Sequence, residues 1–200
     1  MARRTFFSFH YAPDVWRVNI VKHCWVVKPE DQIAEGFLDG SVFEASKRES
    51  PDELKSFLRK GLKNSSVTCV LIGTNTHERR WVRYEIVQSI LKGNGLLSVN
   101  IHDLEDMNEE TTAKGVDPLT QIGLYKGDSG IYFAEKKDGK WVQYADYKST
   151  VTPSDLWFPA PTNNTVVPLS KHCFRYDFVE QNGHENIGGW IELAAVEAGR

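Results

Sequence analysis

The sequence predicts an α/β protein in which helices cover both faces of a doubly wound parallel sheet. Two observations lead to this fold class. Continuous apolar segments, such as SVTCVLIG at 66–73, lack the alternating polar face of a strand exposed on one side. Segments with helical spacing and capping signals lie between these strands, and strands that alternate with helices usually pair in parallel.

The first predicted elements lie in the N-terminal third of the chain. RTFFSFH at 4–10 is an apolar and aromatic segment that favours a buried strand. A helix over about 15–27 should follow, with Asp14 as its N-cap and with Trp16, Ile20 and Cys24 at helical spacing. GSVFEA at 40–45 is expected to form a second strand.

Two further helices have clear start signals. Ser50, followed by proline and by Glu53, forms a capping box that predicts a helix over 53–64. After the strand at 66–73, Asn75 is expected to cap a helix that continues to residue 93. Its apolar arc consists of Val82, Ile86, Val87, Ile90 and Leu91. Glu85 falls on the opposite side, which is expected to be wet, one turn after Trp81. GLLSVNIHD at 95–103 is the next predicted strand.

The C-terminal part has a different pattern. IYFAEKKDGKWVQYAD at 131–146 predicts two strands joined by a tight Asp138-Gly139 turn. A further strand is expected within 172–179 and an amphipathic helix over 186–197. We therefore expect one domain over 1–200, with a core over about 1–125 and an extension over about 126–200. The large aromatic residues of the extension should cover the sheet edge and outer helices, or partly cover a ligand cleft: Trp141, Trp157, Phe158 and Trp190.

Composition excludes several classes of protein. A formal net charge of −3 provides no broad basic surface, so we expect no nucleic-acid partner. No apolar segment is long enough to predict a membrane span. Three cysteines without metal or redox spacing indicate reduced thiols and a cytoplasmic location. The pairs His23-Cys24 and His172-Cys173 are neighbours in sequence, a poor spacing for a shared metal, so no metal ligand is expected.

A ligand site is expected at one edge of the sheet, because ligands of open parallel sheets bind beyond the carboxyl ends of the strands. Two segments with unusual chemistry leave such ends, SFHYAPD at 8–14 and GTNTHERRWVRYE at 73–85. Neither contains a phosphate loop or a Gly-x-Gly-x-x-Gly motif. Glu85 has an ordinary interpretation as a helix-dipole carboxylate. Trp81 favours a functional one, because a large apolar side chain is expected to be covered or to line a cavity.

Both segments resemble sequence boxes of Toll/interleukin-1 receptor (TIR) domains. TFFSFHYAPD at 5–14 resembles the first TIR box, and SVTCVLIGTNTHERRWVRYEI at 66–86 resembles the strand, loop and helix that carry the W-x-x-x-E motif. The resemblance covers residues 4 to about 102 and is strongest to the TIR-like proteins of the bacterial Thoeris antiphage defence system. It implies a flavodoxin-like, TIR-like sheet, with the C-terminal β-hairpin and helix as an extension.

The resemblance also implies an activity. TIR enzymes cleave NAD at the nicotinamide–ribose bond, and the catalytic glutamate of their motif matches Glu85. The matching positions imply that substrate is bound by Phe6, Ser8, His10, Tyr11 and Trp81. NAD is then a substrate, and no cofactor is expected. Similarity to the Thoeris proteins further implies a cyclic ADP-ribose isomer that diffuses to a downstream effector, and a phage-derived trigger.

Two alternatives to this enzyme stay open. The first alternative is a catalytically silent TIR-like interaction module. The second is a nucleoside-transferring enzyme of related α/β fold that also places a glutamate at a ribose. One departure from the TIR pattern concerns assembly. The segment EASKRESPDE at 44–53 lacks the acidic-Pro-Gly turn that TIR domains usually carry there.

Overall fold

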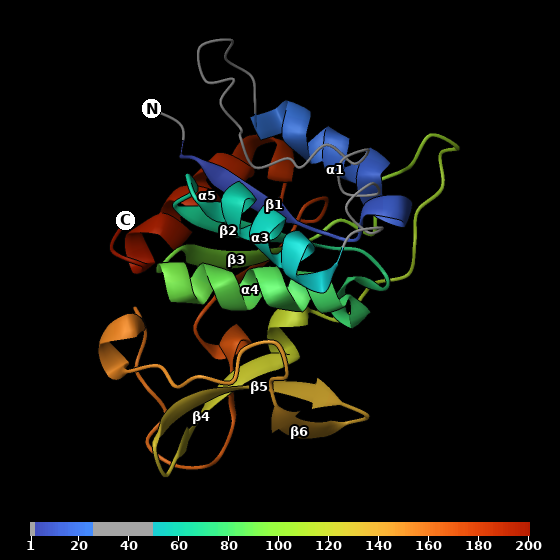
Figure 1. The fold of residues 1–200 in the computed structure, drawn as a ribbon. Coiled ribbons are helices and arrows are strands. Elements are labelled where there is room, and N and C mark those ends of the chain that lie inside the picture. Colours follow the sequence, from blue (N-terminus) through green and yellow to red (C-terminus); the bar gives the residue numbers. More distant parts are fainter. Residues whose placement is uncertain (1–2, 26–49) are drawn as a thin grey trace.

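The computed structural model describes residues 3–25 and 50–200, which form a stack of four layers (Figure 1). Helices α1 (Tyr11–Trp25) and α5 (Gly183–Glu197) cover one face of a first sheet. Helices α3 (Pro51–Leu62) and α4 (Arg80–Lys92) cover its other face, and a second sheet packs on the far side of α4. The strand expected at 40–45 lies outside the described residues.

The first sheet confirms the predicted fold class. Within the described residues, its four strands are all parallel and have the order β1 (Thr5–Ser8), β2 (Val67–Ile72), β3 (Gly95–Asn100) and β8 (Phe174–Asp177). Every residue of β1, β2 and β3 is buried, as expected for strands covered on both faces. The strands predicted at 4–10, 66–73 and 95–103 therefore exist, with ends up to three residues shorter than the apolar segments that indicated them.

The fourth strand changes the expected division between core and extension. β8 pairs with β3, and α5 packs on the first sheet. Trp190 of α5 stacks on Tyr176 of β8, with ring centroids 4.4 Å apart. Residues 174–197 thus belong to the first sheet and its cover, although they lie beyond the boundary expected near residue 125. Long-range strand pairing leaves no local signal for such a return.

The second sheet is the part added to the α/β core. Its strands are antiparallel and have the order β6 (Lys140–Gln143), β5 (Gly130–Lys137), β4 (Ile122–Gly127) and β7 (Val167–Pro168). Asp138 and Gly139 join β5 to β6 with φ of 48° and 76°. Positive φ at both central residues is what a two-residue hairpin turn needs, so the predicted hairpin is confirmed.

Helix α4 begins later than predicted. A 3-10 turn, Thr76–Glu78, precedes it, and Asn75 makes no side-chain cap within the described part of the chain. The hydroxyl of Thr76 accepts a hydrogen bond from the Gly73 amide at 2.9 Å, which closes a turn directly after β2. At the other end, Gly93 has φ of 72° and terminates the helix in the left-handed conformation.

The other two N-terminal helices differ in how well their starts were predicted. The Ser50–Glu53 capping box of α3 is present, with both reciprocal hydrogen bonds. In contrast, α1 begins at Tyr11, and Asp14 is a buried residue of its first turn instead of its N-cap. Trp16 is 48% exposed, whereas Val18 of the same helix lies in the core.

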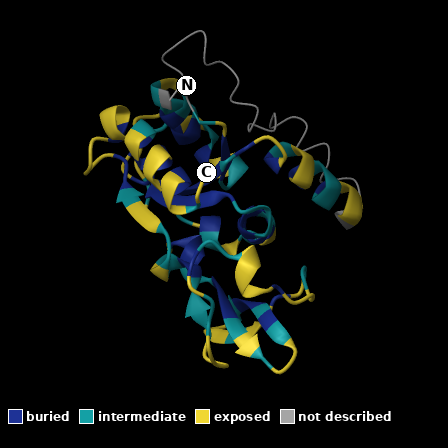
Figure 2. Ribbon diagram, turned by 90° about the vertical axis from the view of Figure 1, so that its left-hand side faces the viewer, coloured by how far each residue is buried: buried dark blue, intermediate teal, exposed yellow. Residues whose placement is uncertain are grey.

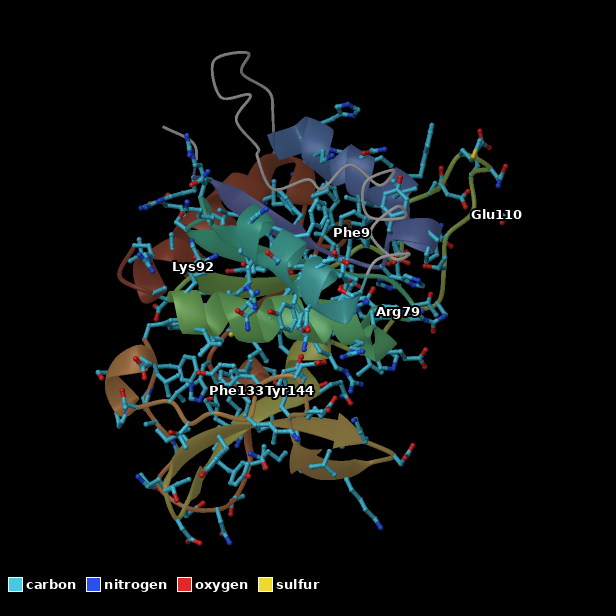
Figure 3. The ribbon with its side chains drawn as sticks, in the orientation of Figure 1. Phe9, Arg79, Lys92, Glu110, Phe133 and Tyr144 are labelled. Carbon is cyan, nitrogen blue, oxygen red and sulfur yellow. The ribbon has the colours of Figure 1, made fainter. Side chains whose placement is uncertain are left out.

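Two apolar clusters hold the layers together. One lies between the first sheet and helices α1 and α5. The other joins α4 to the second sheet and also contains Val70 and Leu96 of the first sheet. Figure 3 shows Phe133 and Tyr144 of this cluster pointing toward α4. Figure 2 shows buried residues in both regions. Phe158 belongs to the second cluster and Trp190 to the first, so both cover the core. None of the described helices is long and apolar enough to cross a membrane.

The contact between β3 and α5 is tight enough to test. A Cβ atom on Gly95 would lie 2.1 Å from the Ala194 carbonyl oxygen, and backbone cannot move aside cheaply. We expect Gly95→Ala to lower the free energy of unfolding by about 1–3 kcal/mol or more, as overpacking does. Urea unfolding followed by circular dichroism measures this change.

Gly189→Ala is the matched control, because the residue sits within α5 and nothing lies within 4 Å of the position that an added methyl group would take. This change should be neutral or stabilise by about 0.5–1 kcal/mol, since alanine favours helix. Equal stability of the two variants would contradict the close packing of α5 on β3.

Candidate active site

Ser8 and Glu85 form the contact that joins the two TIR-like boxes. Ser8 is the last residue of β1, and Glu85 lies in the second turn of α4. The Ser8 hydroxyl donates a hydrogen bond to Glu85 Oε2. Both residues are nearly closed off from solvent, with exposed fractions of 1% and 7%. Helical spacing alone suggests a wet face for Glu85, and this burial excludes it.

The polar side of α4 is buried because the sheet offers it hydrogen bonds. Asn94 Nδ2 donates to Thr68 Oγ1 at 3.2 Å, and the hydroxyls of Thr68 and Ser89 are 2.7 Å apart. Ser89 Oγ in turn donates to the Glu85 carbonyl oxygen at 2.7 Å. We call Ser8, Thr68, Glu85, Ser89 and Asn94 the polar seam. The apolar arc of α4 forms one cluster with the second sheet and with Val70 and Leu96 of the first sheet.

Burial has a direct electrostatic consequence for Glu85. It raises the pKa of the carboxyl to about 8, because a charge in this interior loses most of its hydration. The hydrogen bond from Ser8 acts in the opposite direction and favours the ionised form. In the free protein the pKa of this carboxyl therefore lies close to neutral pH. Groups with perturbed pKa values of this kind are concentrated at functional sites.

Phe6 and Trp81 occupy different environments beside this pair. Phe6 shares the α4-facing side of β1 with Ser8, because strand side chains alternate, and only 1% of it is exposed. Trp81 is half-buried one turn before Glu85 and packs against the cluster formed by Leu54, Leu58 and Tyr84. Its ring meets the edge of Tyr84, with centroids 6.0 Å apart. Neither contact tests the predicted role in substrate binding.

His10 and Tyr11 lie where β1 passes into α1, at the carboxyl end of the strand. Both are half-buried, and the Tyr11 ring lies 6.2 Å from that of Phe9, which Figure 3 labels. Their position at the ligand-binding edge agrees with the expected location of the site. Their substrate-binding roles remain predictions.

Asp14 has a role at this edge that its sequence pattern, typical of a helix cap, does not indicate. The Asp14 carboxylate is buried and interacts with Thr76, in the turn that follows β2. A Cβ atom on Gly73 would come within 2.3 Å of both carboxylate oxygens, so any larger residue there would have to displace the Asp14 carboxylate. Burial raises the pKa of Asp14 to about 6, against the opposing effect of Arg17. Asp14 thereby joins the first box to the turn that leads into α4.

Arg17, one turn further along α1, holds the segment that follows β3. Although it is fully buried, its guanidinium donates to the carbonyl oxygens of Leu104 at 2.7 Å and Glu110 at 2.6 Å. Figure 3 shows Glu110 on this long connection beside α1. An arginine in an amphipathic pattern normally indicates solvent, so the sequence contains no signal for this role.

The fold and the site together define a TIR-like protein: a parallel sheet with a buried glutamate of the W-x-x-x-E motif hydrogen bonded to the end of its first strand. The family described as "Thoeris protein ThsB, TIR-like domain" matches residues 6–106. A protein of Bacillus cereus strain MSX-D12 with the provisional name cyclic ADP-D-ribose synthase ThsB1 is 37% identical over 198 residues. That alignment covers 96% of this chain and 100% of the relative. The chain belongs to the ThsB family of Thoeris TIR-like proteins.

Glu85 should make the stability of this protein depend on pH. A carboxyl whose folded-state pKa is about 8 binds a proton more tightly when folded than when unfolded, where the ordinary value is 4.5. The stability that this tighter binding adds is complete below the pKa of the unfolded state. It is lost as the pH rises through the pKa of the folded state. We expect Glu85→Gln to gain stability relative to wild type between pH 5 and pH 8, by about 1 kcal/mol per pH unit.

Urea unfolding of both proteins at several pH values measures this difference. Asp146→Asn is the matched control, because hydrogen bonds from Arg80 and Lys55 lower the pKa of Asp146 to about 2. That pKa predicts a stability difference that stays flat over the same range. A Glu85→Gln difference that is equally flat would show that Glu85 is not held in a desolvated site.

Proposed function

We propose that this protein cleaves NAD at the nicotinamide–ribose bond and closes the remaining ADP-ribose into a cyclic isomer. The observation that carries the proposal is the buried Glu85 carboxyl beside Ser8, at the carboxyl end of β1. The name of the Bacillus cereus relative, which spans nearly the whole chain, supports the same product class. NAD is a substrate in this reaction and not a resident cofactor.

The reaction suits a single carboxylate. Nicotinamide leaves from a cationic ring as a neutral molecule, so the leaving group needs no proton. Positive charge develops on the ribose as the bond breaks, as in glycoside cleavage. A carboxylate fixed beside the sugar stabilises that charge most strongly where water is excluded. Glu85 has the necessary burial, and Ser8 fixes one of its two oxygens.

Substrate and catalytic group should activate each other. The pKa of about 8 keeps much of Glu85 protonated in the free protein at neutral pH. A bound cationic nicotinamide ring favours the charged carboxylate and lowers this pKa. The enzyme therefore acquires its full negative charge when the cation that needs it has bound.

Exclusion of water also determines the product. In a site that is closed to solvent, the adenosine part of the same ADP-ribose attacks the anomeric carbon in place of water. The cyclic product then diffuses to a downstream effector, and a phage-derived trigger starts the reaction. Trp81, Phe6, His10 and Tyr11 bind the rings and phosphates of NAD in this proposal.

Glu85→Gln keeps the size and polarity of the side chain but removes its charge. We expect nicotinamide release to fall by about 10²- to 10³-fold, as when one transition-state partner is lost, while the fold is kept. Nicotinamide and ADP-ribose products are measured by mass spectrometry, with purified protein and with lysate from phage-infected cells. Unchanged product formation would remove Glu85 from the catalytic role.

The same assay separates the alternatives. A silent interaction module releases no nicotinamide in either setting, with or without Glu85. A nucleoside-transferring enzyme acts on free deoxynucleosides when NAD is left out. Linear ADP-ribose as the only product would keep the cleavage step and overturn the cyclisation.

Ser8→Ala tests the positioning role of the serine. Loss of its hydrogen bond should raise the pKa of Glu85 further, because this bond favours the ionised form. We expect the rise of kcat/KM with pH to move to higher pH, with about tenfold lower activity at pH 7 and partial recovery in alkali.

Ser98→Ala is a suitable control, since this buried serine donates to a different carboxylate, Asp117, at 3.0 Å. Ser98→Ala should leave the pH dependence of kcat/KM unchanged. A uniform loss of activity at every pH in Ser8→Ala would show that Ser8 does not act through Glu85.

A further inference from the structure

A second cluster of chemically active side chains lies at the carboxyl ends of β3 and β8, apart from Glu85. His102 follows β3 by two residues, Asp103 comes next, and Asp177 ends β8. One ligand atom from each of the three residues lies within 4.8 Å of the other two. His102 and Asp177 are buried, whereas Asp103 is exposed. The cluster thus has a closed inner side and an open outer side.

The inner side contains a histidine nitrogen without a hydrogen bond. His102 Nδ1 is shielded from solvent, and no described residue provides it with a hydrogen-bond partner. It faces Asp177 Oδ2 at 3.9 Å, which is too long for a hydrogen bond. The His102 side chain is only 9% exposed. Buried polar atoms nearly always have a partner, so this nitrogen indicates a ligand position.

The two oxygens of the Asp177 carboxylate, which lies opposite His102, have different contacts. Asp177 Oδ1 accepts a hydrogen bond from the Glu180 amide at 3.2 Å, which fixes the side chain. Asp177 Oδ2 is left facing His102 and is approached by Lys114 Nζ at 3.3 Å. Lys114 is 47% exposed, so its ammonium reaches the carboxylate from the solvent side. The protein therefore places a partly exposed positive charge beside Asp177 Oδ2, the oxygen that faces His102 Nδ1.

We propose that His102, Asp103 and Asp177 bind a divalent cation of the Mn²⁺ or Zn²⁺ type, for which Lys114 substitutes when the ion is absent. One imidazole nitrogen and two carboxylates form a donor set that suits these ions better than Ca²⁺, which takes oxygen ligands alone. Asp103 Oδ2 lies 3.3 Å from His102 Nε2, the other ring nitrogen, so this exposed carboxylate must turn toward the Nδ1 side to complete the set. Water fills the remaining positions. Residues 102 and 177 are far apart in sequence, so spacing alone indicates no metal here.

An ion at this place would steady the long connection after β3. Asp103 lies at the start of this connection, and Asp177 is anchored in the sheet. The same connection later crosses the end of β2, where Thr74 Oγ1 donates to the Ala113 carbonyl oxygen at 2.9 Å. A Cβ atom on Gly115 would lie 2.0 Å from the Gly73 carbonyl oxygen, which shows how closely the backbones meet. The proposed ion is therefore structural and independent of NAD chemistry.

Mn²⁺ is the probe, because it is paramagnetic and the protein is not. We expect electron paramagnetic resonance titration of the full chain to show one bound ion, with spin-echo modulation from a directly coordinated nitrogen. Asp177→Asn should weaken binding at least about tenfold, and His102→Gln should remove the nitrogen signal. Lys114→Met should tighten binding about tenfold, since it removes a competing charge at an exposed position.

Asp146→Asn is the matched control, because this acid is held by two cations, Lys55 and Arg80, and should not affect Mn²⁺ binding. Circular dichroism checks that each variant is folded. Absence of Mn²⁺ binding in both wild type and Lys114→Met would overturn the proposal. Binding without nitrogen modulation, or binding that Asp146→Asn weakens as much as Asp177→Asn, would also overturn it.

Discussion

The structure depends on one constraint, which is that α4 turns its polar side toward the sheet. Glu85 can be buried there because Ser8 hydrogen bonds to its carboxyl, and Ser89 can be buried because Thr68 lies opposite. An unpaired buried polar group costs about 1–3 kcal/mol, so these partners fix the rotation of the helix. The apolar arc of α4 then meets the first sheet only at Val70 and Leu96 of its cluster and otherwise extends beyond it. The second sheet covers this arc, which explains why the α/β core carries an added β layer.

Ion pairs between these layers hold α4 in the same orientation. Arg83 contacts Glu135 of β5 at 3.0 Å, and both side chains are largely buried. Asp146, beyond β6, binds Arg80 of α4 at 2.7 Å and Lys55 of α3 at 2.9 Å. Rotation of α4 would break these contacts together with the polar seam. The added layer therefore helps to hold the Glu85 carboxyl against Ser8.

The burial of Glu85 lowers the stability of the fold but favours the proposed reaction. Burial raises the pKa of Glu85, and the protein loses stability as that carboxyl ionises in the folded state. The same desolvation strengthens the attraction between the carboxylate and a cationic sugar. Asp14 and Arg17 of α1 support the site from the other face by holding the turn after β2 and the connection after β3. The carboxyl edge of the sheet is thus shaped by a few buried charged groups.

The sequence by itself determined the local elements and the motif: the apolar strand at 66–73, the Ser50 capping box, the Asp138-Gly139 turn and the Trp81-to-Glu85 spacing. These features depend on neighbouring residues, and periodicity or turn chemistry reports them directly. Only the tertiary structure decided that β8 joins the first sheet, that Asp14 faces Thr76, and that the polar side of α4 is the inner one. Helical spacing assigns Glu85 to the face opposite the apolar arc, but it cannot tell which face meets the sheet. That choice depends on hydroxyls supplied by Ser8 and Thr68, which distant segments bring together only when the chain folds.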